Sequence, residues 1–259
     1  MTQPITILFY PESPEPESVA AQLCSHLGYA ISNNPTESFD VAFKYFDATF
    51  FSPAMLDSLD PIRGDVVNSK SLDISKQAIA DIFRVVFGYD LNIDPTEYEG
   101  KIVGKSNINA LRDGEILDSP LLAIAPDTVY QKFIDSKTET EDTFLEFVVP
   151  IHDQEIPFVY QQTRAVSARF ERKNIRVDLK EPLDVFDKDE LEKILGFAKN
   201  IGLECGEIDV LRDKNDGRIY VIDVENTPYY FPDSLNKVQK EAAIELLSRT
   251  FLSLIVHRL

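Results

Sequence analysis

The chain has 259 residues, of which 44% are hydrophobic and 27% charged, and this length and composition are typical of a globular protein with one or two cores. Its 44 acidic residues outnumber 26 Lys and Arg, and the resulting net charge of −18 argues against nucleic acid or an anionic membrane as a partner. No apolar run reaches transmembrane length and the N-terminus lacks the features of a signal peptide, so we expect a cytoplasmic protein.

Residues 1–66 are predicted to form a small α/β domain. Its expected elements are a buried strand, a helix and one or two aromatic-rich strands, at 5–9, 18–27 and within 39–51. The segment Asp-Pro-Ile-Arg-Gly at 60–64 is rich in turn-forming residues, so we place a boundary there and assign 67–259 to a second domain.

The second domain is expected to begin with a helix. Ile79 and Phe83 recur at helical spacing, and either Asp73 or Ser75 can cap the helix N-terminus. Lys76 then falls in the first turn, where the helix dipole favours anions rather than cations. A lysine at this position is unusual, and the sequence leaves open whether it is simply a solvated side chain.

A largely antiparallel sheet is predicted over residues 101–162. Its expected strands are 101–105, 129–134, 144–151 and 156–162. The following segment, 163–173, is basic and includes Arg164 and Arg169, which is unusual in so acidic a chain. This segment is either a solvated loop or a surface that faces phosphate groups.

Residues 205–228 are predicted to form a β-hairpin, because Lys-Asn-Asp-Gly at 214–217 separates two β-rich runs. Folding about this turn places Asp209 opposite Asp223, within one residue, and puts Glu225 on the same face as Asp223. Like charges about 5 Å apart destabilise a sheet unless water or a cation lies between them. The acids therefore either face water at a sheet edge or hold a cation such as Mg²⁺, which prefers oxygen ligands.

Two helices are expected on either side of this hairpin. The first covers 186–201, where Asp187 and Glu190 occupy the positions of a capping box. The second covers about 233–257 and has the apolar spacing of a packed helix.

Common catalytic motifs are missing from the sequence. It contains no GxSxG, no HExxH, no cysteine cluster and no glycine-rich phosphate loop. If a nucleotide binds, lysines and arginines must therefore hold its phosphates, together with a metal ion held by the hairpin carboxylates.

The hairpin sequence DVLRDKNDGRIYVIDVENTP resembles the paired metal-binding strands of the ATP-grasp family. The resemblance covers about residues 68–230 and implies an α+β, two-subdomain ATP-grasp-like fold preceded by the small α/β domain. It also implies that Asp209, Asp223 and Glu225 hold Mg²⁺, although Glu225 stands where the family usually has Asn.

The same resemblance assigns the ATP-binding residues. Lys76 resembles the first ATP-binding lysine of the family, and Lys105 resembles the second, on a strand before the loop that covers the phosphates. Gln131 occupies the place of the hinge, so the backbone of Lys132 and Phe133 is expected to contact the adenine edge.

Arg164 and Arg169 resemble basic residues that face the phosphate or the acyl group, and they are the predicted catalytic residues. Two features depart from the family pattern. Val148 stands on a strand where members often carry Arg. In place of glycines, the phosphate-covering loop has Asn107, Asn109 and Arg112.

The resemblance implies an enzyme that uses ATP and Mg²⁺ to join a carboxylate to an amine through an acylphosphate, with small molecules or peptides as substrates. Two alternatives remain open at this point. One is a small-molecule kinase on the same fold, and the other is a non-catalytic module that binds a nucleotide or a partner protein.

Overall fold

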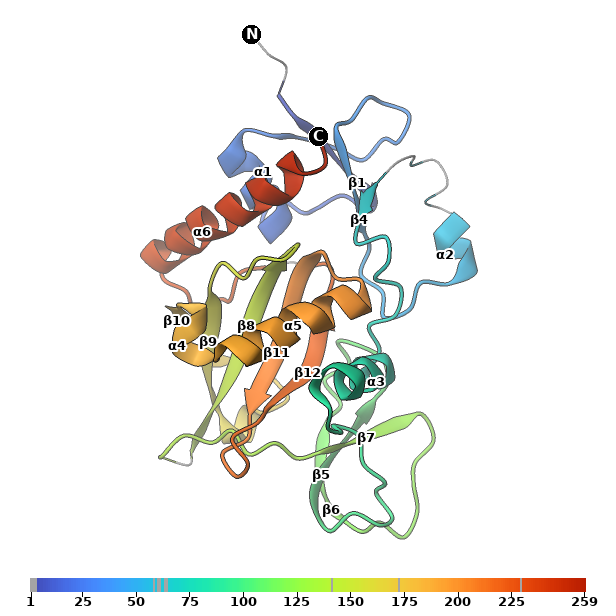
Figure 1. Ribbon diagram of the computed structural model, residues 1–259, viewed down its shortest axis with the longest axis vertical. Helices are drawn as coiled ribbons and strands as arrows, with labels where there is room; N and C mark the ends of the chain where they lie inside the picture. Colours follow the sequence, from blue (N-terminus) through green and yellow to red (C-terminus); the bar gives the residue numbers. More distant parts are fainter. Residues whose placement is uncertain are drawn as a thin grey trace.

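The computed structural model describes residues 4–57, 59, 62, 65–140, 142–171, 173–228 and 230–259. These residues form a mixed α/β molecule whose strands lie in three sheets, with the orders β2-β1-β3-β4, β10-β9-β8-β11-β12 and β6-β5-β7 (Figure 1). This arrangement confirms the expected fold class. None of the helices in the described ranges is both long and apolar enough to cross a membrane.

The N-terminal unit is a parallel sheet with helices beside it. Its elements are β1 (Thr6–Pro11), α1 (Val19–Leu27), β2 (Ala30–Ser32), β3 (Val41–Tyr45), α2 (Pro53–Asp57) and β4 (Val66–Val67). The segment 39–51 contributes only one strand to the sheet, because the chain leaves it after Tyr45 and the rings of Phe46 and Phe51 pack edge to face. The C-terminal helix α6 (Lys237–Val256) lies alongside α1 (Figure 1).

The remaining strands belong to two antiparallel sheets. The small sheet contains β5 (Gly100–Ser106), β6 (Glu115–Ser119) and β7 (Thr128–Lys132). The large sheet contains β8 (Thr143–His152), β9 (Val159–Ala165), β10 (Asn174–Lys180), β11 (Cys205–Arg212) and β12 (Ile219–Glu225). The prediction of one sheet over 101–162 was therefore wrong, because β7 pairs with β5 whereas β8 pairs with β9 and β11.

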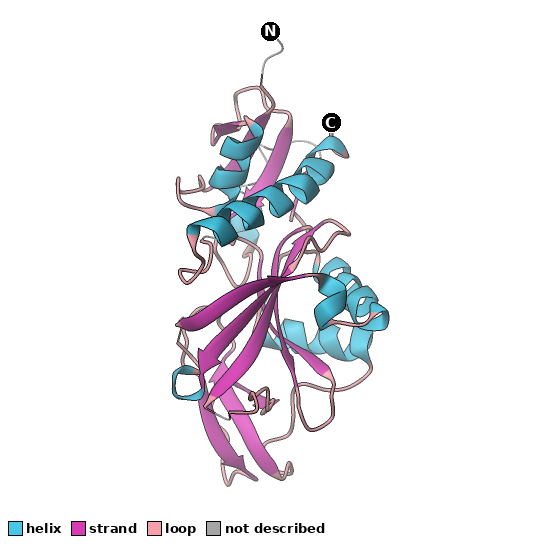
Figure 2. Cartoon of the chain, turned by 90° about the vertical axis from the view of Figure 1, so that its left-hand side faces the viewer, coloured by secondary structure: helices cyan, strands magenta, loops and turns pink. Residues whose placement is uncertain are grey.

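Two helices cover one face of the large sheet (Figure 2). They are α3 (Lys76–Phe87), which is capped by Ser75, and α5 (Lys188–Ile201), where the predicted capping box of Asp187 and Glu190 is present. The short elements η1 (Val166–Ala168) and α4 (Pro182–Val185) complete the chain. Since this face is filled by helices, the opposite face of β8, β11 and β12 is left for a site.

A single asparagine ties the first sheet to the start of β11. Asn68 follows β4 with a left-handed φ of 63° and is 2% exposed. Its side-chain oxygen accepts the N–H groups of Glu204 and Cys205, at 2.8 and 2.9 Å, and its side-chain nitrogen donates to the carbonyl oxygen of Asn226 at 3.1 Å. The N-terminal unit is thereby fixed against the end of the hairpin.

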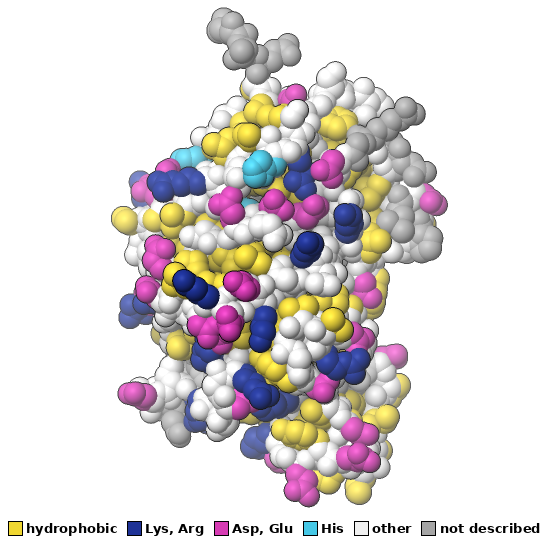
Figure 3. All heavy atoms as spheres, in the orientation of Figure 1, with side chains coloured by type: hydrophobic (Ala, Val, Ile, Leu, Met, Phe, Trp, Pro, Cys, Tyr) yellow, Lys and Arg dark blue, Asp and Glu magenta, His cyan; other side chains and the backbone are white. Residues whose placement is uncertain are grey.

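On the face shown in Figure 3, basic and acidic side chains are interspersed. The negative charge of the chain is thus not collected into one acidic surface on this side of the molecule. Several acids lie together in the cavity between the two antiparallel sheets.

His152 gives a prediction about stability and pH. The ring is 4% exposed, its Nδ1 lies 2.6 Å from Thr250 Oγ1, and burial lowers its pKa from 6.5 to about 4. Between pH 6.5 and pH 4, His152 is protonated in the unfolded chain but stays neutral in the folded chain. The free energy of unfolding is therefore expected to fall by up to about 3 kcal/mol as the pH decreases over this range. Denaturant titrations between pH 4 and 8 should show that His152→Gln removes this part of the pH dependence. An unchanged dependence in the variant would contradict the assignment.

Candidate active site

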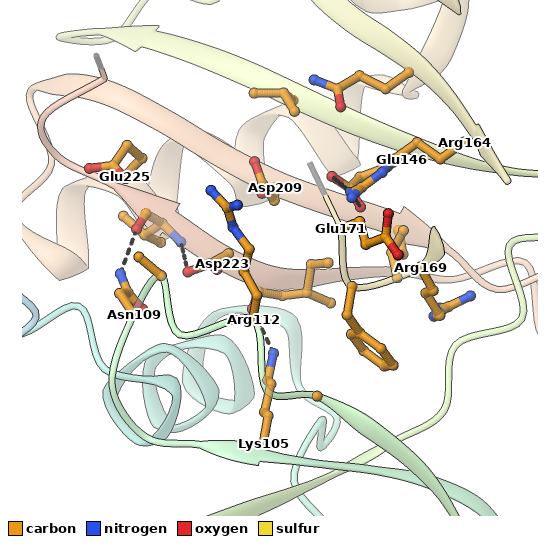
Figure 4. A pocket seen from close by; sticks show the side chains of 18 of the residues that line it. Lys105, Asn109, Arg112, Glu146, Arg164, Arg169, Glu171, Asp209, Asp223 and Glu225 are labelled. Carbon is orange, nitrogen blue, oxygen red and sulfur yellow. Dashed lines mark hydrogen bonds and ion pairs between the residues drawn. The ribbon is translucent and has the colours of Figure 1, made fainter. Parts of the chain in front are cut away.

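A cavity of about 440 Å³ lies between the small sheet and the large sheet (Figure 4). Its walls come from β5, β7, β8, β9, β11 and β12, from the loop 107–114 and from the segment after β12. Lys76 and Lys105 line it, as do Gln131, Lys132, Arg164, Arg169, Asp209, Asp223 and Glu225. The structure therefore brings nine of the ten predicted site residues to one cavity, and Phe133 is the exception.

The strand pair β11–β12 forms the acidic floor. Asp209 is directly opposite Asp223, so the predicted register of the hairpin is confirmed, and Glu207 is opposite Glu225. All four side chains line the cavity, whereas Ile208 between them packs into the core beneath α3 and α5. Strand alternation thus places the acids on one face and the apolar residues on the other.

A bulge in β12 provides a contact for Lys105. The pairing with consecutive residues of β11 skips from Asp223 to Val221, so Ile222 is the extra residue. Its carbonyl oxygen accepts a hydrogen bond from Lys105 Nζ at 3.1 Å. Burial, aided by the nearby charge of Lys76, lowers the pKa of Lys105 to about 8. The second predicted lysine therefore reaches across from the small sheet to the acidic floor.

Lys76 is the first residue of α3 and is only 5% exposed. Its Nζ donates to Asp223 Oδ1 at 2.5 Å and to Asn109 Oδ1. The helix dipole disfavours a cation at this end, and the carboxylate of Asp223 offsets that cost. The open question about Lys76 is settled: it is a buried, paired lysine.

Two of the floor carboxylates, those of Asp209 and Glu225, are buried next to other negative charges. Burial, and then the charges of Glu146 and Asp223, raise the pKa of Asp209 well above its ordinary range. Burial, followed by the charge of Asp47, raises the pKa of Glu225 to about 8. A cation bound among these oxygens would relieve both effects.

The carboxylate oxygens of the floor are ligands of the type that Mg²⁺ prefers, but too few of them lie close together to complete its coordination. Within the described part of the chain, no three Asp, Glu, His or Cys side chains are close enough together to hold a metal ion by themselves. Asp223 is paired with Lys76, and Glu225 Oε1 accepts the backbone N–H of Thr227 at 3.1 Å. Such a site fits the usual coordination of Mg²⁺ by one or two carboxylates together with phosphate oxygens and water.

Arg164 is committed to a buried ion pair. Its Nη1 donates to both carboxylate oxygens of Glu146, at 2.9 and 2.8 Å, and the two residues are 8% and 7% exposed. Burial raises the pKa of Glu146, and the charge of Arg164 opposes that rise. The position is compatible with contact to a ligand, but the first role of the guanidinium is to neutralise Glu146.

We expect Arg164→Ala to reduce the free energy of unfolding by about 3–5 kcal/mol, because it leaves Glu146 buried without a counter-charge. Adding Glu146→Gln to this variant should recover part of the loss, since the uncompensated charge is then removed. Chemical denaturation of the three proteins measures both steps. A double variant no more stable than Arg164→Ala would contradict this interpretation.

Arg169 follows η1 in the chain, and its side chain lies beside the segment that follows β7. Its Nη2 donates to the carbonyl oxygen of Ile134 at 2.7 Å, and its guanidinium lies 4.6 Å from the ring centre of Phe133 and 4.9 Å from that of Phe144. Its predicted role toward phosphate or the acyl group remains a prediction.

The hydrogen-bonding groups of the predicted hinge, residues 131–133, are partly engaged by other residues of the chain. Gln131 is buried and donates to Asn92 Oδ1 at 3.1 Å. The backbone N–H of Lys132 donates to the carbonyl of Leu91 at 2.9 Å, and that of Phe133 donates to the carbonyl of Lys101 at 3.2 Å. These two amides are therefore engaged before any ligand binds, and the Phe133 side chain packs beneath Arg169 outside the cavity wall.

Sequence reasoning did not select Glu146, Glu207 or Arg112 as site residues. Glu146 had a local signal, since it is the one charged residue in the apolar run 144–151. Glu207 had another, because it is two residues before Asp209 and shares its strand face. Arg112 was noted only as a departure in a loop expected to be glycine-rich.

No protein-family model matches the sequence, and no curated protein matches it either. Solved structures do match. The D-alanine–D-alanine ligase of Bacillus anthracis in complex with ATP has 17% sequence identity and a TM-score of 0.56, covering 98% of this chain and 95% of that one. The ATP-grasp ligase PsnB with a precursor variant, Mg and ADP has 10% identity, a TM-score of 0.61 and 98% coverage of both chains.

A third match, the D-cycloserine synthetase DcsG, has 12% identity and a TM-score of 0.54, and covers 97% of this chain and 99% of that one. At such low identities these likenesses concern the fold. The chain has the fold of the ATP-grasp ligases over nearly its whole length.

Proposed function

We propose that this protein is an ATP- and Mg²⁺-dependent ligase that joins a carboxylate to an amine through an acylphosphate. The observation that carries the proposal is the meeting of Lys76 and Lys105 with the acids Asp209 and Asp223 in one cavity between two sheets. The shared fold supports it, because the neighbours include ligases described with ATP or with Mg and ADP.

In this proposal Lys105 and Lys76 bind the phosphates of ATP, and the segment from Gln131 to Ile134 borders the adenine. One or two of the carboxylates of Asp209, Asp223 and Glu225 would supply oxygen ligands for Mg²⁺, which would neutralise negative charge on the phosphates. A partly closed pocket makes these interactions stronger than they are in water.

The reaction has two steps. A carboxylate oxygen of the first substrate attacks the γ-phosphorus of ATP, the bond to the β–γ bridging oxygen breaks, and ADP leaves. The amine of the second substrate then attacks the acyl carbon, loses a proton and displaces phosphate. The lysines and arginines position the anionic groups in both steps.

The substrates that fit are small molecules or peptides, as with neighbours named for amino acids or precursor peptides. The test is phosphate release from MgATP with a panel of carboxylates and amines, added singly and in pairs. The proposal expects release only when an acid and an amine are both present, with one phosphate per product. A phosphorylated product formed without amine would favour a kinase, and MgATP binding without turnover on any pair would favour a non-catalytic module.

A further inference from the structure

The loop between β5 and β6, residues 107–114, is held over the cavity by asparagine side chains. Asn107 Oδ1 accepts the backbone N–H of Gln77 in α3 at 2.9 Å. Asn109 Nδ2 donates to the carbonyl of Val224 in β12 at 3.1 Å. The loop is therefore anchored to both a helix of the core and the acidic floor, although it has few glycines.

This anchoring directs Arg112 into the cavity (Figure 4). Ala110 and Arg112 both adopt left-handed backbone conformations, with φ of 63° and 53°, and so turn the loop back after Asn109. Asp113 Oδ1 accepts the backbone N–H of Ser106 at 3.2 Å and closes the loop on the other side. Arg112 is thus presented by a loop whose two ends are fixed.

The other cations that line the cavity already have partners. Lys76 is paired with Asp223, Lys105 with the carbonyl of Ile222, Lys132 with Asp213 and Asp216, Arg164 with Glu146, and Arg169 with the carbonyl of Ile134. Arg112 differs, since it makes no hydrogen bond or ion pair with any residue that the structure describes. Among these residues it is the cavity cation that would not have to give up or share a partner in order to bind an anion.

The floor that Arg112 faces lacks a cation at one point of the large sheet. Val148 pairs with Asp209 across β8 and β11, lines the cavity and brings no charge. Tyr160, the partner of Val148 on β9, also lines the cavity without contributing a positive charge. An anion bound above this part of the floor would gain no positive charge from Val148 or Tyr160, and Arg112 could supply one from the loop side.

We propose that Arg112 contacts the phosphoryl group that is transferred, as a hydrogen-bond donor first to the γ-phosphate of ATP and then to the acylphosphate. The inference rests on the proposed ligase function and adds a catalytic residue to it. A guanidinium suits this task, because its planar set of N–H donors matches two phosphate oxygens at once and it stays charged throughout the reaction. Together with the lysines of the cavity, it would neutralise negative charge on the transferred group.

The test compares two nucleotides that differ in the γ-phosphate. Calorimetric titrations of the full chain with MgADP and with the Mg²⁺ complex of the β,γ-imido analogue of ATP are made for the wild type, Arg112→Ala and Arg112→Lys. The control is Arg249→Ala, an exposed arginine on α6. Arg112→Ala is expected to weaken binding of the ATP analogue about 10- to 100-fold while changing MgADP affinity less than about threefold. Arg112→Lys should lie between, and the control should match the wild type.

Equal losses for both nucleotides would assign Arg112 to the shape of the loop and overturn the inference, as would no loss for either. Thermal unfolding of each variant separates these results from misfolding, because an exposed arginine without partners should not alter the unfolding temperature. A wild type that binds neither nucleotide would refute the proposed function itself, which is a different result from failure of Arg112 to distinguish them.

Discussion

Asp223→Asn is expected to weaken binding of MgATP about 100-fold and to reduce turnover about 10²- to 10³-fold. The change removes a charged ligand from the acidic floor and also takes away the carboxylate that Lys76 contacts at 2.5 Å. Affinity for ATP in the presence of EDTA should change far less, because the metal contribution is then absent from both proteins. Titrations with and without Mg²⁺ measure this difference.

Asp118→Asn is the matched control for this variant. Asp118 is an exposed acid on β6 that pairs with Lys101 at the surface, so its neutralisation removes the same charge without touching the cavity. If Asp223→Asn binds MgATP and turns over as the control does, the assignment of the hairpin as the metal site is wrong.

Gly206→Ala is also expected to cause a large loss of stability. A Cβ at Gly206 would lie 2.3 Å from the backbone oxygen of Glu225 and 2.5 Å from Leu203 Cδ1. A backbone oxygen cannot move aside as a flexible side chain can, so β11 and β12 would have to separate where they carry Glu207 and Glu225. We expect a loss of at least about 3 kcal/mol in the free energy of unfolding.

Gly196→Ala provides the control with the opposite sign. Gly196 lies in α5, and its added Cβ would meet only Val86 Cγ1, at the ordinary contact distance of 3.7 Å. Alanine is preferred over glycine inside a helix, so this variant should gain about 0.5–1 kcal/mol. Urea denaturation measures the free energy of unfolding of both variants, and similar values for the two would contradict these expectations.

The parts of the site that depend on local sequence could be predicted. The turn at 214–217 was sufficient to place Asp209 opposite Asp223 to within one residue, and the bulge at Ile222 accounts for that residue. The capping residue and the helical spacing were sufficient to place Lys76 in the first turn of α3. In each case the deciding contacts lie within one hairpin or one helix, where spacing in the sequence determines position in space.

Other features depend on contacts between distant segments and had no local signal. The bulge at Ile222 leaves a carbonyl oxygen that accepts a hydrogen bond from Lys105. It arises from the pairing of β12 with β11, and the residue types of β12 do not predict it. The pairing of Arg164 with Glu146 joins two adjacent strands. Spacing alone presented Arg164 as a free cation, whereas the fold gives it a buried partner.

Arg112 also could not be evaluated from the sequence, but for it the fold adds a role instead of removing one. In the sequence it is one polar residue of a loop, and the loop was notable mainly for its missing glycines. Its importance depends on Asn107 and Asn109, which anchor the loop to α3 and β12. Their partners, Gln77 and Val224, lie 30 and 115 residues away in the sequence, so these contacts become visible only in the folded chain.

The central claim is that the cavity between the two sheets binds MgATP, and calorimetric titration of the wild type and Lys105→Ala tests it most directly. Lys101→Ala is the matched control, because Lys101 is on the same strand but its side chain is 58% exposed and paired with Asp118. We predict one MgATP per wild-type chain, unchanged binding in Lys101→Ala, and affinity reduced about 10- to 100-fold in Lys105→Ala. The absence of saturable binding to the wild type, or equal binding by all three proteins, would contradict the claim.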